Sequence, residues 1–221
     1  MIPVSVLVVA KAPVPGLAKT RLAAGVGDDE AAEIAAAALL DTLDAVAEAS
    51  VTARVVALTG NLGDAKRSGE ILSRLADFVV VAQRGEDFAD RLANAHLDAA
   101  SVTGGLPVLQ IGMDTPQVTP ELIGRCAQAL ADNDAVLGLA RDGGWWVLGV
   151  TDAATAYCLR GVPMSAPDTG AETLAALQRA GVTVELVAEL ADVDTLDDVE
   201  IVRRDCRPES RFSRAVAGVS A

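Results

Sequence analysis

Val4-Ser-Val-Leu-Val-Val-Ala10 is a short, continuously apolar run in which β-branched residues predominate, and it decides the fold class of the chain. Such a run is typical of a strand that is buried on both faces of a mainly parallel sheet. The wider apolar run, residues 2–10, lacks the positively charged region that precedes a signal-peptide core, and it is too short to span a bilayer. We therefore predict that it forms the first strand of a buried sheet.

Outward from this strand, apolar segments of strand length alternate with segments in which Ala, Leu and Ile recur at helical spacing. The order β-α-β-α-β-α-β-α-β-β-α-β-α predicts a three-layer α/β/α domain with a mostly parallel central sheet and helices on both faces. The predicted strands are 4–10, 53–58, 78–82, 106–111, 134–140, 145–150 and 182–187, and the predicted helices are 28–49, 64–75, 86–101, 119–130, 170–180 and 195–204.

The periodic pattern continues without a linker or an internal repeat until it fails near residue 205. We predict one nucleotide-binding domain over residues 1–205 and a loosely ordered tail over residues 206–221. Charged residues are spaced so that no run of about eighteen apolar residues occurs between them. We therefore expect that the chain has no membrane span and that the protein is cytoplasmic.

The composition excludes several classes of function. The chain of 221 residues is 51% apolar and 22% charged, which is typical of a globular protein. Its net charge of −13 would repel a phosphate backbone, and its 3% aromatic residues provide few stacking platforms, so we expect no nucleic-acid partner. Small phosphorylated ligands remain open, because they need only a few local cations.

The histidine and cysteine counts exclude further sites. His96 is the only histidine, so zinc sites with several histidines cannot form, and a Ser-His-Asp triad could form only around it. It lies in a helix-like stretch, where we expect a solvated or packed side chain. Cys126, Cys158 and Cys206 are too far apart for paired zinc spacing, and their odd number does not suit a disulfide framework.

Strands of such a sheet usually carry ligand-binding loops at their carboxyl ends. The first loop is Lys11-Ala-Pro-Val-Pro-Gly-Leu-Ala-Lys-Thr-Arg-Leu22, in which two prolines stiffen a segment with three cations. Lys11, Lys19 and Arg21 suit a di- or triphosphate, with Gly16 allowing close backbone approach. The alternative is that these cations are solvated or pair with the acidic helix that follows. The loop matches neither a P-loop nor a dinucleotide fingerprint.

Two further loops carry candidate residues. In Ile111-Gly-Met-Asp-Thr-Pro116, Asp114 follows a buried strand and could hold a divalent cation that bridges phosphates, or it could simply cap a turn. The segment Arg141-Asp-Gly-Gly-Trp-Trp146 is first of all a hairpin signal. Its two adjacent tryptophans would point to opposite faces of a strand, which favours a pocket wall.

The last candidate segment is Ala191-Asp-Val-Asp-Thr-Leu-Asp-Asp198. Helix capping explains Thr195, Asp197 and Asp198. It leaves Asp192 and Asp194, which lie at i and i+2 on one side of an extended stretch, and these two carboxylates either repel each other or share a cation.

Together and in this order, the four segments resemble the glycosyltransferase-like family of bacterial proteins related to the nucleotide-diphospho-sugar transferases. The chain is also similar to the 2-phospholactate guanylyltransferases, which share the Lys-Thr-Arg-Leu loop and the closing Asp-x-Asp-Thr stretch. The matching residues are 11–22, 111–116, 142–146 with Leu148-Gly149, and 192–198.

The resemblance implies a glycosyltransferase-A-type fold that binds a nucleoside diphosphate sugar or triphosphate with Mg²⁺ or Mn²⁺. It implies that Lys19 and Arg21 hold phosphates, that Asp114 is a metal ligand, and that Asp192 or Asp194 completes the metal site. Met113 stands where a small serine is expected, and Trp145-Trp146 stands where a tyrosine pair or a tyrosine-aliphatic pair is more familiar. Both departures lie on the acceptor side, so they concern the identity of the acceptor.

Three functions follow from these features. The first is transfer of a sugar from a nucleoside diphosphate sugar to a small-molecule acceptor, the second is nucleotidyl transfer from a nucleoside triphosphate with release of pyrophosphate, and the third is nucleotide binding without turnover. The sequence also leaves a homodimer open. The predicted catalytic residues are Lys19, Arg21 and Asp114, the predicted metal ligands are Asp114, Asp192 and Asp194, and the predicted substrate-binding residues are Lys11, Pro13, Gly16, Thr20, Asp142, Gly143, Gly144 and Trp145.

Overall fold

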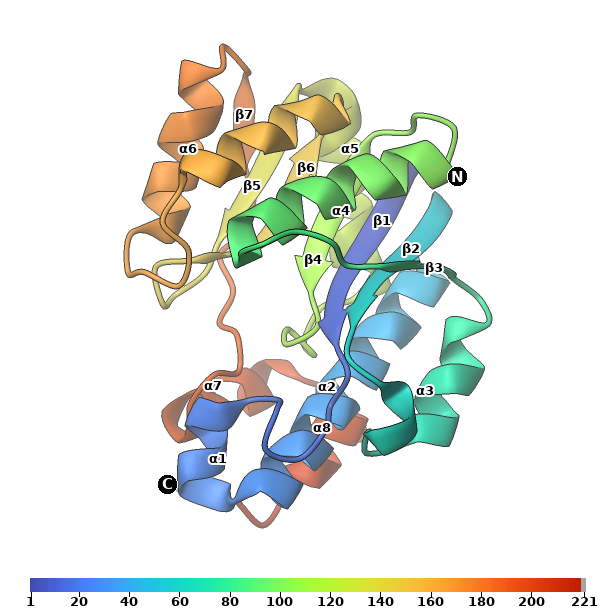
Figure 1. Ribbon diagram of the computed structural model, residues 1–221, viewed down its shortest axis with the longest axis vertical. Helices are drawn as coiled ribbons and strands as arrows, with labels where there is room; N and C mark the ends of the chain where they lie inside the picture. The colour runs from blue at the N-terminus through green and yellow to red at the C-terminus, as the bar shows by residue number, and fades with distance from the viewer. Residues whose placement is uncertain (220–221) are drawn as a thin grey trace.

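A seven-stranded sheet with the order β3-β2-β1-β4-β6-β5-β7 forms the centre of the protein in the computed structural model, which describes residues 1–219 (Figure 1). Only β6 runs antiparallel to its neighbours β4 and β5, and every other strand pairing in the described chain is parallel. The predicted three-layer α/β/α fold with a mostly parallel sheet is thus confirmed. The strands are β1 (Ile2–Lys11), β2 (Val51–Thr59), β3 (Val79–Ala82), β4 (Val108–Gly112), β5 (Ala135–Leu139), β6 (Trp145–Val150) and β7 (Val184–Leu186).

Helices cover both faces of this sheet. Side chains of α2, α3 and α5 pack with the largest hydrophobic core on one face, whereas α4, η2 and α6 cover the other face. Strand β1 lies between β2 and β4 and is buried on both faces, which explains its continuously apolar sequence. The helices are α1 (Thr20–Val26), α2 (Asp28–Glu48), η1 (Leu62–Asp64), α3 (Ser68–Leu75), α4 (Phe88–Val102), α5 (Pro120–Asp132), η2 (Ala153–Gly161), α6 (Thr169–Arg179), α7 (Leu196–Asp205) and α8 (Arg211–Ala215).

The sheet has a topological switch point between β1 and β4. From β1 the chain builds outward through β2 to β3, and it then returns to the other side of β1 with β4. Crevices form at such points, outside the carboxyl ends of the strands. In Figure 1 this edge faces downward, and α1, α7, α8 and the beginning of α2 gather below it.

Four segments differ from the sequence-based expectations. One of them is η2 (Ala153–Gly161), where the sequence pattern predicted no helix. Thr20 and Arg21, which we expected in a loop, begin helix α1. The predicted helix 64–75 is divided into η1 and α3, because Arg67 takes a left-handed conformation with φ 51°. Residues 206–219, part of the tail expected to be loosely ordered, include helix α8, whose Phe212 is fully buried. A five-residue helix is too short to show a periodic pattern, so no pattern in the sequence predicted it.

No helix within residues 1–219 combines the length and the apolar character that crossing a membrane requires.

Candidate active site

The first loop and the end of β4 meet at an ion pair. The Nζ atom of Lys19 lies 2.6 Å from Oδ2 of Asp114, although the two residues are 95 positions apart in the sequence. Lys19 takes a left-handed conformation with φ 49° and ψ 49° as the N-cap of α1. This conformation is uncommon for a residue with a side chain, and here it accompanies a lysine that is held at the sheet edge.

Both residues of this pair are well shielded from solvent, with 13% of the Lys19 side chain and 29% of the Asp114 side chain exposed. Burial lowers the pKa of Lys19, but the charges of Asp114, Asp194 and Asp192 and the hydrogen bond to Asp114 more than offset it. The net result is a raised pKa, so the ammonium group is charged at neutral pH.

A second ion pair continues the cluster on α1. A terminal nitrogen of Arg21 lies 2.6 Å from Oδ2 of Asp194, and Nζ of Lys19 lies 4.0 Å from Oδ1 of the same carboxylate. Arg21 remains 66% exposed, so its guanidinium group is accessible to a ligand. The backbone ties the same segments together, because the N–H of Val193 donates to the carbonyl oxygen of Asp114 at 3.1 Å.

Two further carboxylates, Asp192 and Asp142, act on this cluster electrostatically. Burial, followed by the negative charges of Asp114 and Asp142, raises the pKa of Asp192 to about 7. Asp142 also raises the pKa of Arg21, although the hydrogen bond to Asp194 contributes most. Four carboxylates therefore face the two cations Lys19 and Arg21, which leaves an excess of two negative charges when all are ionised.

The β5–β6 turn fixes the position of Asp142. Its Oδ1 accepts a hydrogen bond from the N–H of Gly144 at 2.8 Å. Gly143 has φ 92°, and a Cβ atom at this residue would lie 1.8 Å from the carbonyl oxygen of Pro167. The carbonyl of Gly143 in turn accepts the N–H of Gly170 at 2.8 Å, so the turn is held against the start of α6. The hairpin predicted from Asp-Gly-Gly is present.

The two tryptophans after this turn lie on opposite faces of the sheet. Trp146 belongs to the largest core and donates its Nε1–H to the carbonyl oxygen of Ala188 at 2.8 Å. Trp145 is partly buried against the cluster under η2 and α6.

The structure thus brings six of the predicted site residues together: Lys19, Arg21, Asp114, Asp142, Asp192 and Asp194.

Other residues of the first loop have different surroundings. Pro13 is buried, and its carbonyl oxygen accepts the N–H of Lys66. Gly16, with φ 74°, lies near the Asp28 carboxylate at the start of α2, while the side chains of Lys11 and Thr20 are exposed and have no polar contact within the described residues.

Three polar residues at or near the site were not indicated by any pattern in the sequence. The amide of Gln83 donates to the carbonyl oxygens of Ala10 and Ala57 and so joins the ends of β1, β2 and β3.

The other two residues lie near the aspartates of the site. Gln117 donates to the carbonyl oxygen of Ala191, next to Asp192. The hydroxyl of Thr115, beside Asp114, is buried without a protein partner. Glutamine and threonine are too common for single positions to stand out without spatial context.

The predicted metal ligands do not form a ready-made cage. Within residues 1–219, no three His, Cys, Asp or Glu side chains converge closely enough to hold a metal ion. Asp114 and Asp194 are bound instead to Lys19 and Arg21. The donor set nevertheless fits a hard divalent cation, because it consists of carboxylate oxygens and lies in a cluster that, with Asp142 included, carries two uncompensated negative charges when all groups are ionised.

A family model described as an uncharacterized protein conserved in bacteria (DUF2064) matches residues 42–166 of the chain, which is more than half of its length. The chain belongs to the DUF2064 family. The matched residues include Asp114 and the hairpin with Asp142, Gly143 and Gly144. Among curated proteins, no relative is found.

Solved structures with the same fold include transferases that act on nucleotides. A protein from Desulfovibrio desulfuricans G20, provisionally assigned as a nucleotide-diphospho-sugar transferase, has a TM-score of 0.85 and 26% identity over 99% of this chain and 97% of its own. CMP:2-keto-3-deoxy-manno-octonic acid synthetase in complex with CTP has a TM-score of 0.50 and 15% identity, with 91% and 97% covered. Rv0371c from Mycobacterium tuberculosis H37Rv in complex with manganese has a TM-score of 0.53 and 18% identity, with 90% and 97% covered.

The DUF2064 chain therefore has the fold of the nucleotide-diphospho-sugar transferases and nucleotidyltransferases. The expected relation to this superfamily is confirmed, and the candidate site lies at the sheet edge where ligands of such folds bind.

Proposed function

We propose that this protein is a metal-dependent transferase that moves a sugar from a nucleoside diphosphate sugar to a small-molecule acceptor. The observation that carries this proposal is the cluster of Lys19, Arg21, Asp114 and Asp194 at the switch point between β1 and β4. The nearly full-length likeness to a protein provisionally assigned as a nucleotide-diphospho-sugar transferase supports it.

Lys19 and Arg21 are suited to bind the diphosphate of the donor. Both are charged at neutral pH, and Arg21 is accessible from solvent. In the free protein each binds a carboxylate, so binding of the diphosphate would exchange a carboxylate for a phosphate partner. The guanidinium of Arg21 can engage two phosphate oxygens at once, whereas the ammonium of Lys19 acts as a compact point charge.

Asp114, Asp192 and Asp194 are the residues that would hold Mg²⁺ or Mn²⁺. When bound, such an ion would neutralise the excess negative charge and stabilise the departing diphosphate. The manganese complex of Rv0371c supports this choice of metal. In the transfer, the bond between the anomeric carbon and the diphosphate oxygen breaks, the acceptor oxygen bonds to that carbon, and the acceptor proton is released.

Nucleotidyl transfer is the second candidate, and the two cations of the first loop favour it. In that reaction an acceptor oxygen attacks the α-phosphorus of a nucleoside triphosphate and pyrophosphate leaves, while Lys19 and Arg21 would stabilise the charge on the α-phosphate. The CTP complex of the octonic acid synthetase, which shares this fold, supports it as well.

The test is to incubate the protein with nucleoside triphosphates and nucleoside diphosphate sugars, each with Mg²⁺ or Mn²⁺ and a mixture of small alcohols, sugars and phosphorylated acids, and to follow phosphorus resonances. Release of nucleoside diphosphate is expected for sugar transfer. Release of pyrophosphate would replace the first candidate by the second.

Matched variants connect the activity to the site. Asp114→Asn should abolish the metal-dependent release, whereas Asp132→Asn, at the end of α5, should leave it unchanged. A parent protein that binds none of these nucleotides in calorimetry would contradict both candidates.

A further inference from the structure

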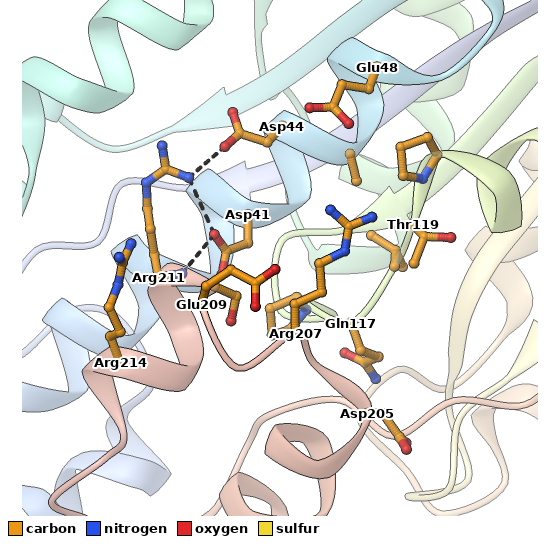
Figure 2. A pocket seen from close by; sticks show the side chains of 15 residues that line it. Asp41, Asp44, Glu48, Gln117, Thr119, Asp205, Arg207, Glu209, Arg211 and Arg214 are labelled. Atoms are coloured by element: carbon orange, nitrogen blue, oxygen red, sulfur yellow. Dashed lines mark hydrogen bonds and ion pairs between the residues drawn. The ribbon is translucent and has the colours of Figure 1, made fainter.

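The C-terminal segment is attached firmly to helix α2. Asp41 of α2 accepts the backbone N–H of Arg211 at 3.1 Å (Figure 2). It also accepts the backbone N–H of Phe212 at 2.8 Å, and so caps the first turn of α8. The guanidinium of Arg211 also pairs with Asp41 at 3.3 Å and with Asp44 at 2.5 Å. These contacts line a cavity of about 220 Å³ between α2, residues 116–120 and the C-terminal segment.

Phe212 enters a second hydrophobic core, separate from the one under the main sheet face. This second core contains no residue of a strand. It collects buried side chains from α1, α2, α7, α8 and the connection before α7, and Phe212 is its largest fully buried side chain. Its buried members are Leu22, Ala31, Ile34, Ala38, Ala191, Val193, Val199, Val202, Cys206, Phe212 and Val216.

The charged residues of the candidate active site alternate with members of this core along the chain. Arg21 directly precedes Leu22, and Asp192 lies between Ala191 and Val193. Asp194 directly follows Val193. Packing of their neighbours in the second core therefore holds the backbone of Arg21, Asp192 and Asp194 in position.

The site residues Arg21, Asp192 and Asp194 lie in two segments, helix α1 and residues 191–195, and neither segment is held strongly by local structure. Helix α1 has only seven residues, which is too short to be stable by itself. Residues 191–195 belong to no strand or helix. Tertiary packing must hold both, and the close approach of α1 to α7 is an example, since a Cβ atom at Gly25 would lie 3.3 Å from Leu196.

We infer that helix α8 is a brace for the active site, and that Phe212 is a positioning residue that keeps Arg21, Asp192 and Asp194 in place. This inference rests on the proposed function for its catalytic meaning, but the positioning itself can be measured without activity.

The first experiment is hydrogen exchange on the full-length chain. Phe212→Ala should increase exchange of backbone amides in residues 20–27 and 191–196, while the amides of β1, β2 and β4 keep their protection. Phe212→Leu should restore most of the protection, because leucine still fills the second core. The matched control is Ile71→Ala, which removes a fully buried side chain from the main core, in α3.

The second experiment is calorimetric titration with inorganic pyrophosphate and Mg²⁺, which probes the diphosphate site whatever the base or sugar. We expect Phe212→Ala to weaken binding about tenfold, in the range of couplings carried by packed side chains. Each variant is measured at the same number of degrees below its own Tm. Under this condition Ile71→Ala should bind pyrophosphate as tightly as the parent does. If Phe212→Ala does not fold, Arg211→Gln takes its place, because it removes the ion pairs of α8 to Asp41 and Asp44 of α2 and to Glu70 of α3.

The exchange and titration results distinguish a failure of the brace from a failure of the proposed function. Unchanged exchange in residues 20–27 and 191–196, or an equal increase in Ile71→Ala, would overturn the brace even if pyrophosphate binds. If the parent does not bind pyrophosphate, the proposed function loses its diphosphate site, and the exchange result still decides the brace.

Discussion

Replacing Asp192 by asparagine is expected to stabilise the metal-free protein above pH 7. The pKa of Asp192 is raised from 3.8 to about 7 by burial and by the charges of Asp114 and Asp142. The folded state therefore holds this carboxylate in a charged form that its surroundings disfavour. Asparagine has nearly the same shape and carries no charge, so it removes this cost.

The sign and size of the effect follow from linkage. Between about pH 4 and pH 7 the folded state binds more protons at Asp192 than the unfolded state does, so the parent loses stability as pH rises through this window. A rise of the Asp192 pKa from 3.8 to about 7 corresponds to about 4 kcal/mol, and solvent screening at this half-buried site reduces this free energy to about 2 kcal/mol. For a chain of this length, about 2 kcal/mol raises Tm by roughly 5 °C.

The assay is urea unfolding in a chelator-containing buffer at pH values from about 4 to 8. The stability difference between Asp192→Asn and the parent should grow through this range and vanish at its acidic end. Glu185→Gln, which removes an exposed carboxylate from β7, is the control and should show no such trend. A variant that is less stable than the parent at every pH, or a difference independent of pH, would refute the reasoning. Added Mg²⁺ should stabilise the parent and not the variant.

Three further predictions concern the same edge of the sheet. Lys19→Met should lower the free energy of unfolding by about 1–3 kcal/mol in urea titrations, because it leaves the shielded carboxylate of Asp114 unpaired, and adding Asp114→Asn should recover most of the loss. Gly143→Ala should cost about 2 kcal/mol or more in thermal unfolding, since the new methyl group would collide with Pro167; an unchanged Tm would mean that the turn moves freely. Asp114→Asn and Asp194→Asn should each weaken Mg²⁺-dependent nucleotide binding in calorimetry, with a combined loss smaller than the sum, whereas additive and metal-independent losses would remove both from one metal site.

The layered fold was accessible from the sequence because it depends on local patterns. The apolar run at Val4–Ala10, the acidic start of the helix at Asp28 and the Asp-Gly-Gly turn at residue 142 each report the burial or the backbone shape of their own segment. Since parallel strands end at one edge of a sheet, the same patterns also placed the four candidate loops together.

The contacts inside the candidate site were decided by the tertiary structure. Lys19 binds Asp114, which is 95 residues away, and Arg21 binds Asp194, which is 173 residues away. These pairings depend on how the helices cross over and pack, which no local pattern specifies. The tail shows the same limit. Phe212 lies in a helix of five residues with no periodicity of its own, and it is ordered because α1, α2 and α7 leave an apolar space that its side chain fills together with Cys206 and Val216. Local periodicity records which face of a segment is buried, whereas the partner that covers that face is fixed only when the whole chain has folded.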